Sequence, residues 1–228
     1  MSGDQLSINE VFHSIQGESS RAGEPCVFVR LRGCPLRCRY CDTEYAFREG
    51  SARPMDDLIK EVVDYGCPLV EITGGEPLIQ PAVHPFMERL CDLGHTVLIE
   101  TAGAHDISAC DDRVIRILDL KTPGSGECDK VLWENIDHLR KEDEVKFVIT
   151  DREDYEWMKE IMNRYELLKR VGHVLASPVF DQTEGRDISG CTGLDPAHLA
   201  KWILSDRLGV RMQLQLHKFI WDPQARGV

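Results

Sequence analysis

Short apolar runs alternate along the chain with longer segments in which apolar residues recur at helical spacing. Runs rich in β-branched residues indicate strands, since branched side chains suit a pleated sheet. The predicted strands are Val27–Arg32, Leu69–Thr73, Thr96–Glu100, Val114–Leu120, Val145–Ile149, His173–Ser177 and Arg211–Leu216.

Four amphipathic helices are predicted between these strands, because apolar residues three or four positions apart share one helical face. The residues of these faces are Met55, Leu58, Ile59, Val62 and Val63, then Val83, Phe86, Met87 and Leu90, then Tyr155, Met158, Ile161 and Met162, and finally Leu199, Trp202 and Ile203. Gly66 and Gly94 are predicted to end the first two helices, as glycine commonly does.

The order of these elements predicts the fold class. Alternating strands and helices favour a parallel sheet with right-handed crossovers. About six core strands are too few to close an eight-stranded TIM barrel. We therefore predict an α/β fold, a partial, open TIM-like barrel with crossover helices, in a single domain spanning residues 1–228. The short connection between the third and fourth strands is predicted to be a loop.

Composition and charge narrow the classes of partner. The net charge of −12 disfavours a nucleic-acid partner, because neutralising phosphates requires a basic face. No apolar run approaches the length of a membrane span, so no membrane partner is expected. The nine cysteines are an odd number in a chain of ordinary composition, which favours free thiols in a reducing cytoplasm over a disulfide framework.

Three cysteines, Cys34, Cys38 and Cys41, follow the first predicted strand with CxxxCxxC spacing. Three thiolates can bind three irons of a [4Fe–4S] cluster and leave the fourth iron open for chemistry. A structural zinc site would need four ligands, usually as two pairs, and no second CxxC occurs. Cys26 could supply a fourth ligand, but it is more simply a core cysteine.

Polar motifs follow most of the other predicted strands. In parallel α/β folds, function gathers at the carboxyl ends of the strands, so these motifs are expected to converge. They are Thr73–Pro77, Glu100–Gly103, Asp119–Ser125, Ser177-Pro178 and His217-Lys218. The Gly-Gly-Glu-Pro run within the first of them is, by itself, also typical of a plain turn.

The cysteine motif, with Tyr40 just before its last cysteine, resembles the signature of the radical S-adenosylmethionine (SAM) superfamily. In that family the open iron binds the amino and carboxylate groups of SAM, and cleavage of SAM yields a 5′-deoxyadenosyl radical. Gly74–Pro77 is similar to the GGE motif of the same enzymes, where glycine allows close approach to SAM and Glu76 can accept a hydrogen bond from its ammonium.

Further motifs extend the resemblance to the 7-carboxy-7-deazaguanine synthase family, from about Ile8 to His217. These motifs are Glu10–Ser19, Asp42-Thr43, Glu100-Thr101 and Gln215–Lys218. The family contracts the ring of 6-carboxy-5,6,7,8-tetrahydropterin to 7-carboxy-7-deazaguanine with loss of ammonia, on the route to queuosine and related deazapurines. The resemblance implies a carbon–nitrogen lyase with a [4Fe–4S] cluster, SAM and Mg²⁺, an electron donor such as flavodoxin or ferredoxin, and a cytoplasmic homodimer.

The resemblance also implies roles for individual residues. Cofactor contacts besides the cysteines are expected from Tyr40, Asp42, Gly75, Glu76, Gly103, Asp119, Lys121, Ser125 and Ser177. Substrate contacts are expected from an N-terminal substrate loop with Ile15, Gln16, Gly17 and Glu18, and from Arg30, Thr101 and His217. Thr43 matches the family's Mg²⁺ ligand. The family's Gln-Gly-Glu-Gly here ends in Ser19, and a C-terminal extension follows Lys218, where some members use their terminal carboxylate in the substrate pocket.

Two alternatives stay open. A glycyl-radical-enzyme activating enzyme shares the CxxxCxxC and Gly-Gly-Glu-Pro motifs but acts on a protein backbone, whereas Gln16–Glu18 and His217 favour a small pterin. A non-enzymatic Fe–S protein would need a fourth protein ligand and would have no use for the loops at Gly75-Glu76 and Thr101.

Overall fold

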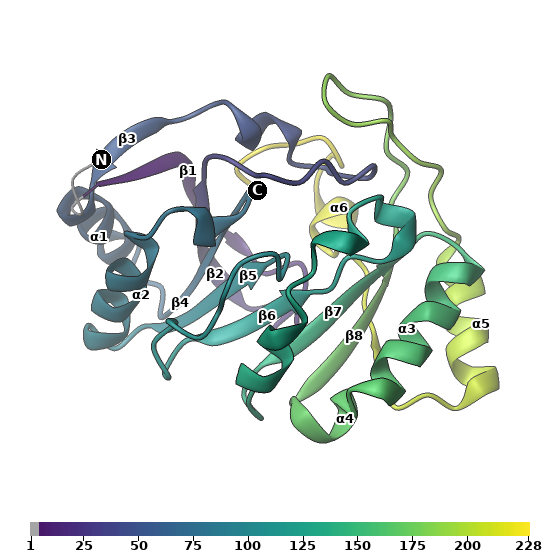
Figure 1. Ribbon diagram of the computed structural model, residues 1–228. Helices are drawn as coiled ribbons and strands as arrows, with labels where there is room; N and C mark the ends of the chain where they lie inside the picture. The colour runs from purple at the N-terminus through teal and green to yellow at the C-terminus, as the bar shows by residue number, and fades with distance from the viewer. Residues whose placement is uncertain (1–4) are drawn as a thin grey trace.

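A computed structural model describes residues 5–228 as one open sheet of nine strands with helices packed against it (Figure 1). The strands are β1 Gln5–Ile15, β2 Pro25–Leu31, β3 Ser51–Pro54, β4 Leu69–Gly74, β5 Thr96–Thr101, β6 Ile115–Asp119, β7 Glu144–Ile149, β8 His173–Pro178 and β9 Arg211–Met212. Their order is β3-β1-β2-β4-β5-β6-β7-β8-β9, and all pairs from β2 to β9 are parallel. This arrangement confirms the predicted partial, open barrel.

Most of the α-helices lie beside the parallel strands of the sheet. The α-helices are α1 Met55–Asp64, α2 Val83–Asp92, α3 Arg152–Arg164, α4 Leu167–Arg170, α5 Pro196–Asp206 and α6 His217–Ile220. Five 3₁₀ helices are η1 Glu44–Phe47, η2 Pro77–Ile79, η3 Pro123–Ser125, η4 Cys128–Lys130 and η5 Trp133–His138. Figure 1 shows α1 and α2 near β4 and α3 to α5 near β7 and β8. The predicted helices thus form as α1, α2, α3 and α5, and β5 connects to β6 by a loop, as predicted. No helix of the described chain is long and apolar enough to cross a membrane.

Helix α1 illustrates how the apolar faces build the core. Leu58 and Val62 are fully buried against the sheet, and full burial of such a side chain stabilises the fold by about 1.5–3 kcal/mol. The prediction that Val63 shares this face is wrong, because its side chain is 44% exposed. Gly66 and Gly94 follow α1 and α2 with φ of 66° and 88°, which confirms the predicted helix ends.

The structure adds two antiparallel strands, β1 and β3, that the sequence pattern did not predict. The alternation of buried and partly exposed residues in β1 is interrupted by a register shift between Ile8 and Glu10, which hides its period of two. Strand β3 has only four residues, and three of them are exposed. Strand β1 extends to Ile15, so only the end of the Glu10–Ser19 segment forms a loop.

The last strand is shorter than predicted, because only Arg211–Met212 joins the sheet. The amide of Gln213 donates to the carbonyl of Ala176 at 3.0 Å, and the chain then leaves β8. The amide of Leu216 donates instead to the carbonyl of Gly17 at 2.9 Å. This detour brings the C-terminal segment (residues 213–228) against the N-terminal loop (residues 16–24).

Candidate active site

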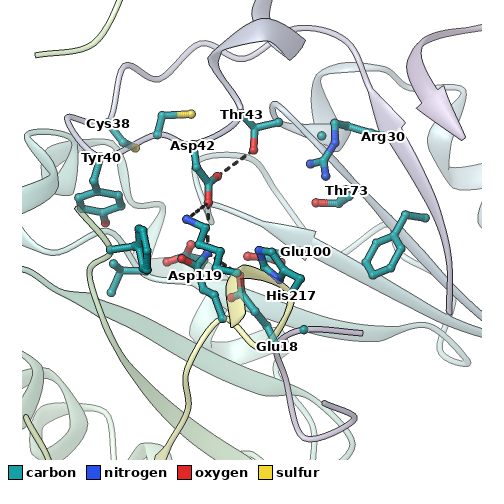
Figure 2. A pocket seen from close by; sticks show the side chains of 18 of the residues that line it. Glu18, Arg30, Cys38, Tyr40, Asp42, Thr43, Thr73, Glu100, Asp119 and His217 are labelled. Carbon is teal, nitrogen blue, oxygen red and sulfur yellow. Dashed lines mark hydrogen bonds and ion pairs between the residues drawn. The ribbon is translucent and has the colours of Figure 1, made fainter. Parts of the chain in front are cut away.

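The carboxyl ends of the parallel strands surround a cavity of about 360 Å³, within the size range of small-molecule sites (Figure 2). Strand ends, the cysteine loop (residues 33–41), the N-terminal loop and the C-terminal segment all contribute to its wall. The structure brings together there Ile15, Gln16, Gly17, Glu18, Arg30, Cys34, Cys38, Tyr40, Cys41, Asp42, Thr43, Gly75, Thr101, Asp119, Lys121, Ser177 and His217.

The cysteine loop carries three free thiols to one end of the cavity. Burial raises the pKa of Cys34 to about 11 and the pKa of Cys41 to about 12. A bound metal offsets this cost, since coordination deprotonates a thiol. Arg37 holds the loop: its Nη1 donates to the carbonyl of Cys34 at 2.8 Å, and its guanidinium lies 4.2 Å from the centroid of the Phe47 ring.

The donor set of this loop fits a three-cysteine cluster. Cys26 is fully buried on β2, where its thiol lies 3.6 Å from the carbonyl of Val27, and it is not part of the cavity wall. In residues 5–228 no three His, Cys, Asp or Glu side chains are close enough to hold one metal ion. The cysteines of an iron–sulfur cube bind different irons, so they need not converge on a single point.

Two glycines let the loop after β4 lie directly against the cysteine loop. Gly74 has a φ of 139°, and a Cβ atom there would lie 2.2 Å from the carbonyl oxygen of Leu31. A Cβ atom on Gly75 would lie 2.0 Å from the carbonyl oxygen of Gly33 and 2.8 Å from Cβ of Cys34. Any larger residue would therefore push the first cysteine away from the strand end.

Glu76 lies behind this wall, with its side chain fully buried. Its carboxylate accepts hydrogen bonds at 2.8 Å from Oγ1 of Thr101 and from the amide of Ala102, and one at 3.1 Å from the amide of Leu78. Glu76 therefore ties the loop after β4 to the loop after β5. Glu76, Gly103 and Ser125 do not line the cavity of the described chain, so the structure gives them supporting positions, and their contact with SAM stays a prediction.

Near the cysteines, two buried polar atoms lack a hydrogen-bond partner in the described chain and are available to a ligand. Lys121 donates to Asp119 Oδ2 at 2.7 Å, and its ammonium lies 5.9 Å from the centroid of the Tyr40 ring. Asp119 Oδ1 and the hydroxyl of Tyr40 are buried without a hydrogen-bond partner among the described residues. A buried polar atom without a partner is costly, so these two atoms fit contact with a bound molecule such as SAM.

An ion-pair cluster around Lys146 forms another part of the cavity wall. Lys146 on β7 donates to Glu18 Oε2 at 2.6 Å and to Glu100 Oε1 at 2.5 Å. Burial alone would raise the pKa of Glu18, but Lys146, His217 and Gln215 together lower it to about 2. Glu18 is therefore an anionic acceptor at the cavity wall.

The N-terminal loop is held in place from several sides. The side chain of Gln16 accepts from the amide of Glu18 at 3.0 Å and donates to Glu71 on β4. A Cβ atom on Gly17 would lie 2.1 Å from Nδ1 of His217, so only glycine allows this contact. Ser19 has a φ of 64°, the left-handed conformation that the family's usual glycine adopts without strain.

Replacing Glu71 with glutamine should stabilise the protein increasingly as the pH rises. Burial, together with the nearby carboxylate of Glu100, raises the pKa of Glu71 from 4.5 to about 8. Between these values the unfolded chain has lost a proton that the folded chain keeps, so the contribution of Glu71 to stability falls as the pH rises. Glutamine does not titrate. The melting temperature of the variant should exceed that of the wild type by several degrees near pH 8 and by little near pH 5. A difference independent of pH would contradict the raised pKa.

Asp42 and Thr43 lie between Cys38 and Arg30 in the view of Figure 2. The hydroxyl of Thr43 donates to Asp42 Oδ1 at 2.9 Å, and Lys218 donates to Asp42 Oδ2 at 2.8 Å. Burial would raise the pKa of Asp42, but Lys218 lowers it well below its usual range. Hydroxyl and carboxylate oxygens are ligands that Mg²⁺ prefers, so this corner fits the ion predicted at Thr43.

Arg30 extends from β2 into the cavity with part of its guanidinium unused. Its Nε donates to Glu10 Oε1 at 2.8 Å, and the hydroxyl of Tyr45 donates to the same oxygen at 2.9 Å. The two terminal nitrogens of Arg30 have no hydrogen-bond partner elsewhere in residues 5–228. They form a fork that fits a ligand carboxylate.

The C-terminal extension also reaches the cavity, and residues 223–228 form part of its wall. The guanidinium of Arg226 lies 3.8 Å from the centroid of the Tyr45 ring and donates to Glu49 Oε2 at 2.9 Å. Val228 lines the cavity, which places the end of this segment at the site.

Sequence reasoning missed Lys146 and Glu71, which no motif marks. The available signal was a charge flanked by apolar residues: Lys146 lies between Val145 and Phe147, and all three are buried. Glu71 lies likewise in the buried run of β4. A charged residue at such a position is rarely buried without a partner.

The chain matches known proteins over almost its whole length. Residues 28–173 match the model of the radical SAM superfamily. The chain is 47% identical to 7-carboxy-7-deazaguanine synthase from Koribacter versatilis over 227 residues, which cover 98% of this chain and 100% of the relative. It is 44% identical to 7-carboxy-7-deazaguanine synthase from Chlorobaculum tepidum, with 98% of this chain and 97% of the relative covered.

Among solved structures, the fold resembles the crystal structure of QueE from Escherichia coli with a TM-score of 0.73. The match covers 93% of this chain and 95% of that chain at 24% sequence identity. At this identity the likeness supports the fold.

Proposed function

This chain belongs to the 7-carboxy-7-deazaguanine synthase family of the radical SAM superfamily, and we propose that it converts 6-carboxy-5,6,7,8-tetrahydropterin to 7-carboxy-7-deazaguanine in the cavity described above. One observation carries the assignment of this site. A single cavity joins three free cysteines to an anionic acceptor, Glu18, and a cationic fork, Arg30. The three cysteines suit an iron–sulfur cluster. Glu18 suits the hydrogen-bond-donating edge of a carboxypterin, and Arg30 suits its carboxylate.

We assign one group of cavity residues to cofactor binding and another to substrate binding. When bound, the [4Fe–4S] cluster and SAM supply the radical chemistry. Cys34, Cys38 and Cys41 would hold the cluster. Asp119 Oδ1 and the Tyr40 hydroxyl supply polar contacts to SAM, and Gly75 keeps the strand end close to the cysteine loop.

At the substrate end, Glu18 accepts hydrogen bonds from the guanidine-like edge of the pterin, and the free fork of Arg30 binds its carboxylate. Contacts at both ends fix the ring in one orientation, so that the intended hydrogen faces the radical. Thr43, whose hydroxyl donates to Asp42, would hold Mg²⁺ at this site. Residues of the C-terminal segment form part of the cavity wall and shield that side of the substrate from water.

We also propose that a small reduced carrier such as flavodoxin or ferredoxin supplies the electron, and that the enzyme acts as a homodimer in the cytoplasm. The nine free cysteines support a reducing environment. A carrier of this kind is needed because none of the described side chains that line the cavity is a low-potential electron donor.

Product analysis tests the proposed function. The reconstituted protein is incubated anaerobically with dithionite, SAM, MgCl₂ and 6-carboxy-5,6,7,8-tetrahydropterin. The products are separated by chromatography, and their masses are measured by mass spectrometry. We expect a product lighter than the substrate by one ammonia, free ammonia in equal amount, and SAM recovered unchanged. Consumption of SAM without a lighter pterin product would contradict the assignment. Omitting Mg²⁺ after chelation should slow turnover.

A further inference from the structure

Lys146 has a donor that the protein itself does not use. Its side chain is 6% exposed, and its ammonium donates to Glu18 Oε2 at 2.6 Å and to Glu100 Oε1 at 2.5 Å. The nearest further carboxylate oxygen, Asp119 Oδ2, is 3.7 Å away, too far for a hydrogen bond. An ammonium has three N–H donors, so one is left without a partner in the part of the chain that the structure describes.

This unused donor belongs to a residue of the cavity wall, next to an acceptor on the same wall. Glu18 and Lys146 both line the cavity. Oε1 of Glu18 accepts from Gln215 at 2.9 Å, and each carboxylate oxygen can accept a second hydrogen bond. The wall therefore presents a hydrogen-bond acceptor and a hydrogen-bond donor side by side, and a buried charged donor is expected to be satisfied by what fills the cavity.

The pattern matches one edge of a pterin. Its pyrimidine ring presents the 2-amino group and N3–H, which donate, followed by the 4-oxo group, which accepts. We propose that Lys146 is a specificity-determining residue that donates to the 4-oxo oxygen while Glu18 accepts from the 2-amino group and N3–H. This inference rests on the proposed function. It explains how the cavity would select a ring with a 2-amino and a 4-oxo group. Rejection of a wrong ring follows because a mismatched edge leaves buried polar groups unpaired.

Two unreduced analogues separate this reading from a purely structural ion pair. One probe is 6-carboxypterin. The other is 2,4-diaminopteridine-6-carboxylate, in which an amino donor replaces the 4-oxo acceptor and faces the ammonium of Lys146, and in which N3 carries a lone pair in place of its hydrogen. The lost N3–H contact to Glu18 is common to the wild type and the Lys146 variants, so a change in preference between them reports the contact at position 4. Affinities are measured at neutral pH from the change in pteridine fluorescence. The wild type should bind 6-carboxypterin at least tenfold more tightly than the diamino analogue.

Replacing Lys146 with methionine should reduce that preference at least tenfold, mainly by weakening 6-carboxypterin binding. A structural role would weaken both analogues alike, and that result would overturn the proposal, as would an unchanged preference. Lys146→Met leaves Glu18 and Glu100 without their cation, so Lys146→Met combined with Glu100→Gln serves as a charge-balanced second variant. The ratio of affinities is the readout in both variants.

Lys159→Met is the matched control, because Lys159 also lies between two carboxylates but outside the cavity. Its ammonium is 2.9 Å from Glu156 Oε2 and 2.7 Å from Asp206 Oδ2. This control should keep the wild-type preference. If the wild type binds neither analogue and forms no product, the proposed function fails. If the wild type binds and turns over but Lys146→Met keeps the preference, only the role of Lys146 fails.

Discussion

Replacing Cys38 with alanine should abolish assembly of the [4Fe–4S] cluster and with it all turnover. The cavity of the described chain offers three cysteines, each expected to bind a different iron, and none to replace a lost ligand. A cube held by two thiolates is exposed to loss of iron, so the effect should be close to complete. Iron and sulfide per chain after anaerobic reconstitution, and the EPR spectrum of the reduced protein with and without SAM, measure the outcome.

Cys26→Ala provides the matched control for this experiment. Cys26 is buried, like Cys38, but lies within β2 and is not part of the cavity wall. Its removal should cost some stability from the small void and leave the cluster and its response to SAM intact. Loss of the cluster in Cys26→Ala would mean that a fourth cysteine participates, and the argument for an open iron would fail.

The central strands could be predicted because buried parallel strands appear as continuous apolar runs, as in β5 and β8. The edges of the sheet gave weaker signals. Residues 211–216 have alternating apolar positions, yet Leu214 and Leu216 are 38% and 36% exposed, because contact with Gly17 draws the chain away from β8. That competition depends on a segment almost two hundred residues earlier, which a local pattern does not contain.

The same limit applies to the site. The cysteines, the glycine pair and the N-terminal loop could be predicted, because each is a local motif with a known use. The pairing of Lys146 with Glu18 could not be predicted, because the two residues are 128 positions apart and are brought together only by the order of the strands. Likewise, Glu76 belongs to a recognised motif, but its burial behind Thr101 follows from how the loops after β4 and β5 pack.

Replacing Arg30 with alanine should greatly reduce turnover of carboxytetrahydropterin while sparing the cofactor chemistry. The Nε atom of Arg30 is committed to Glu10, and its terminal nitrogens are free for the carboxylate of the substrate. Removing one partner of a buried charge pair costs about 2–5 kcal/mol, here expected as a loss of kcat/KM. Formation of 5′-deoxyadenosine from SAM without substrate should persist, because the cysteine loop does not depend on Arg30. Both products are measured in the same anaerobic assay.

The ion pair with Glu10 requires its own control, since Arg30→Ala also leaves that carboxylate without its cation. The guanidinium of Arg30 lies over the Phe12 and Tyr45 rings, at 5.8 Å and 6.0 Å from their centroids, and we expect these contacts to keep it in position in Glu10→Gln. This variant should retain most of the turnover, and Arg30→Lys should recover only part of it, because an ammonium cannot form the two-point contact of the fork. Normal turnover by Arg30→Ala would place Arg30 in the scaffold. Equal losses in Arg30→Ala and Glu10→Gln would show that the ion pair, and not contact with the substrate, is what the enzyme requires.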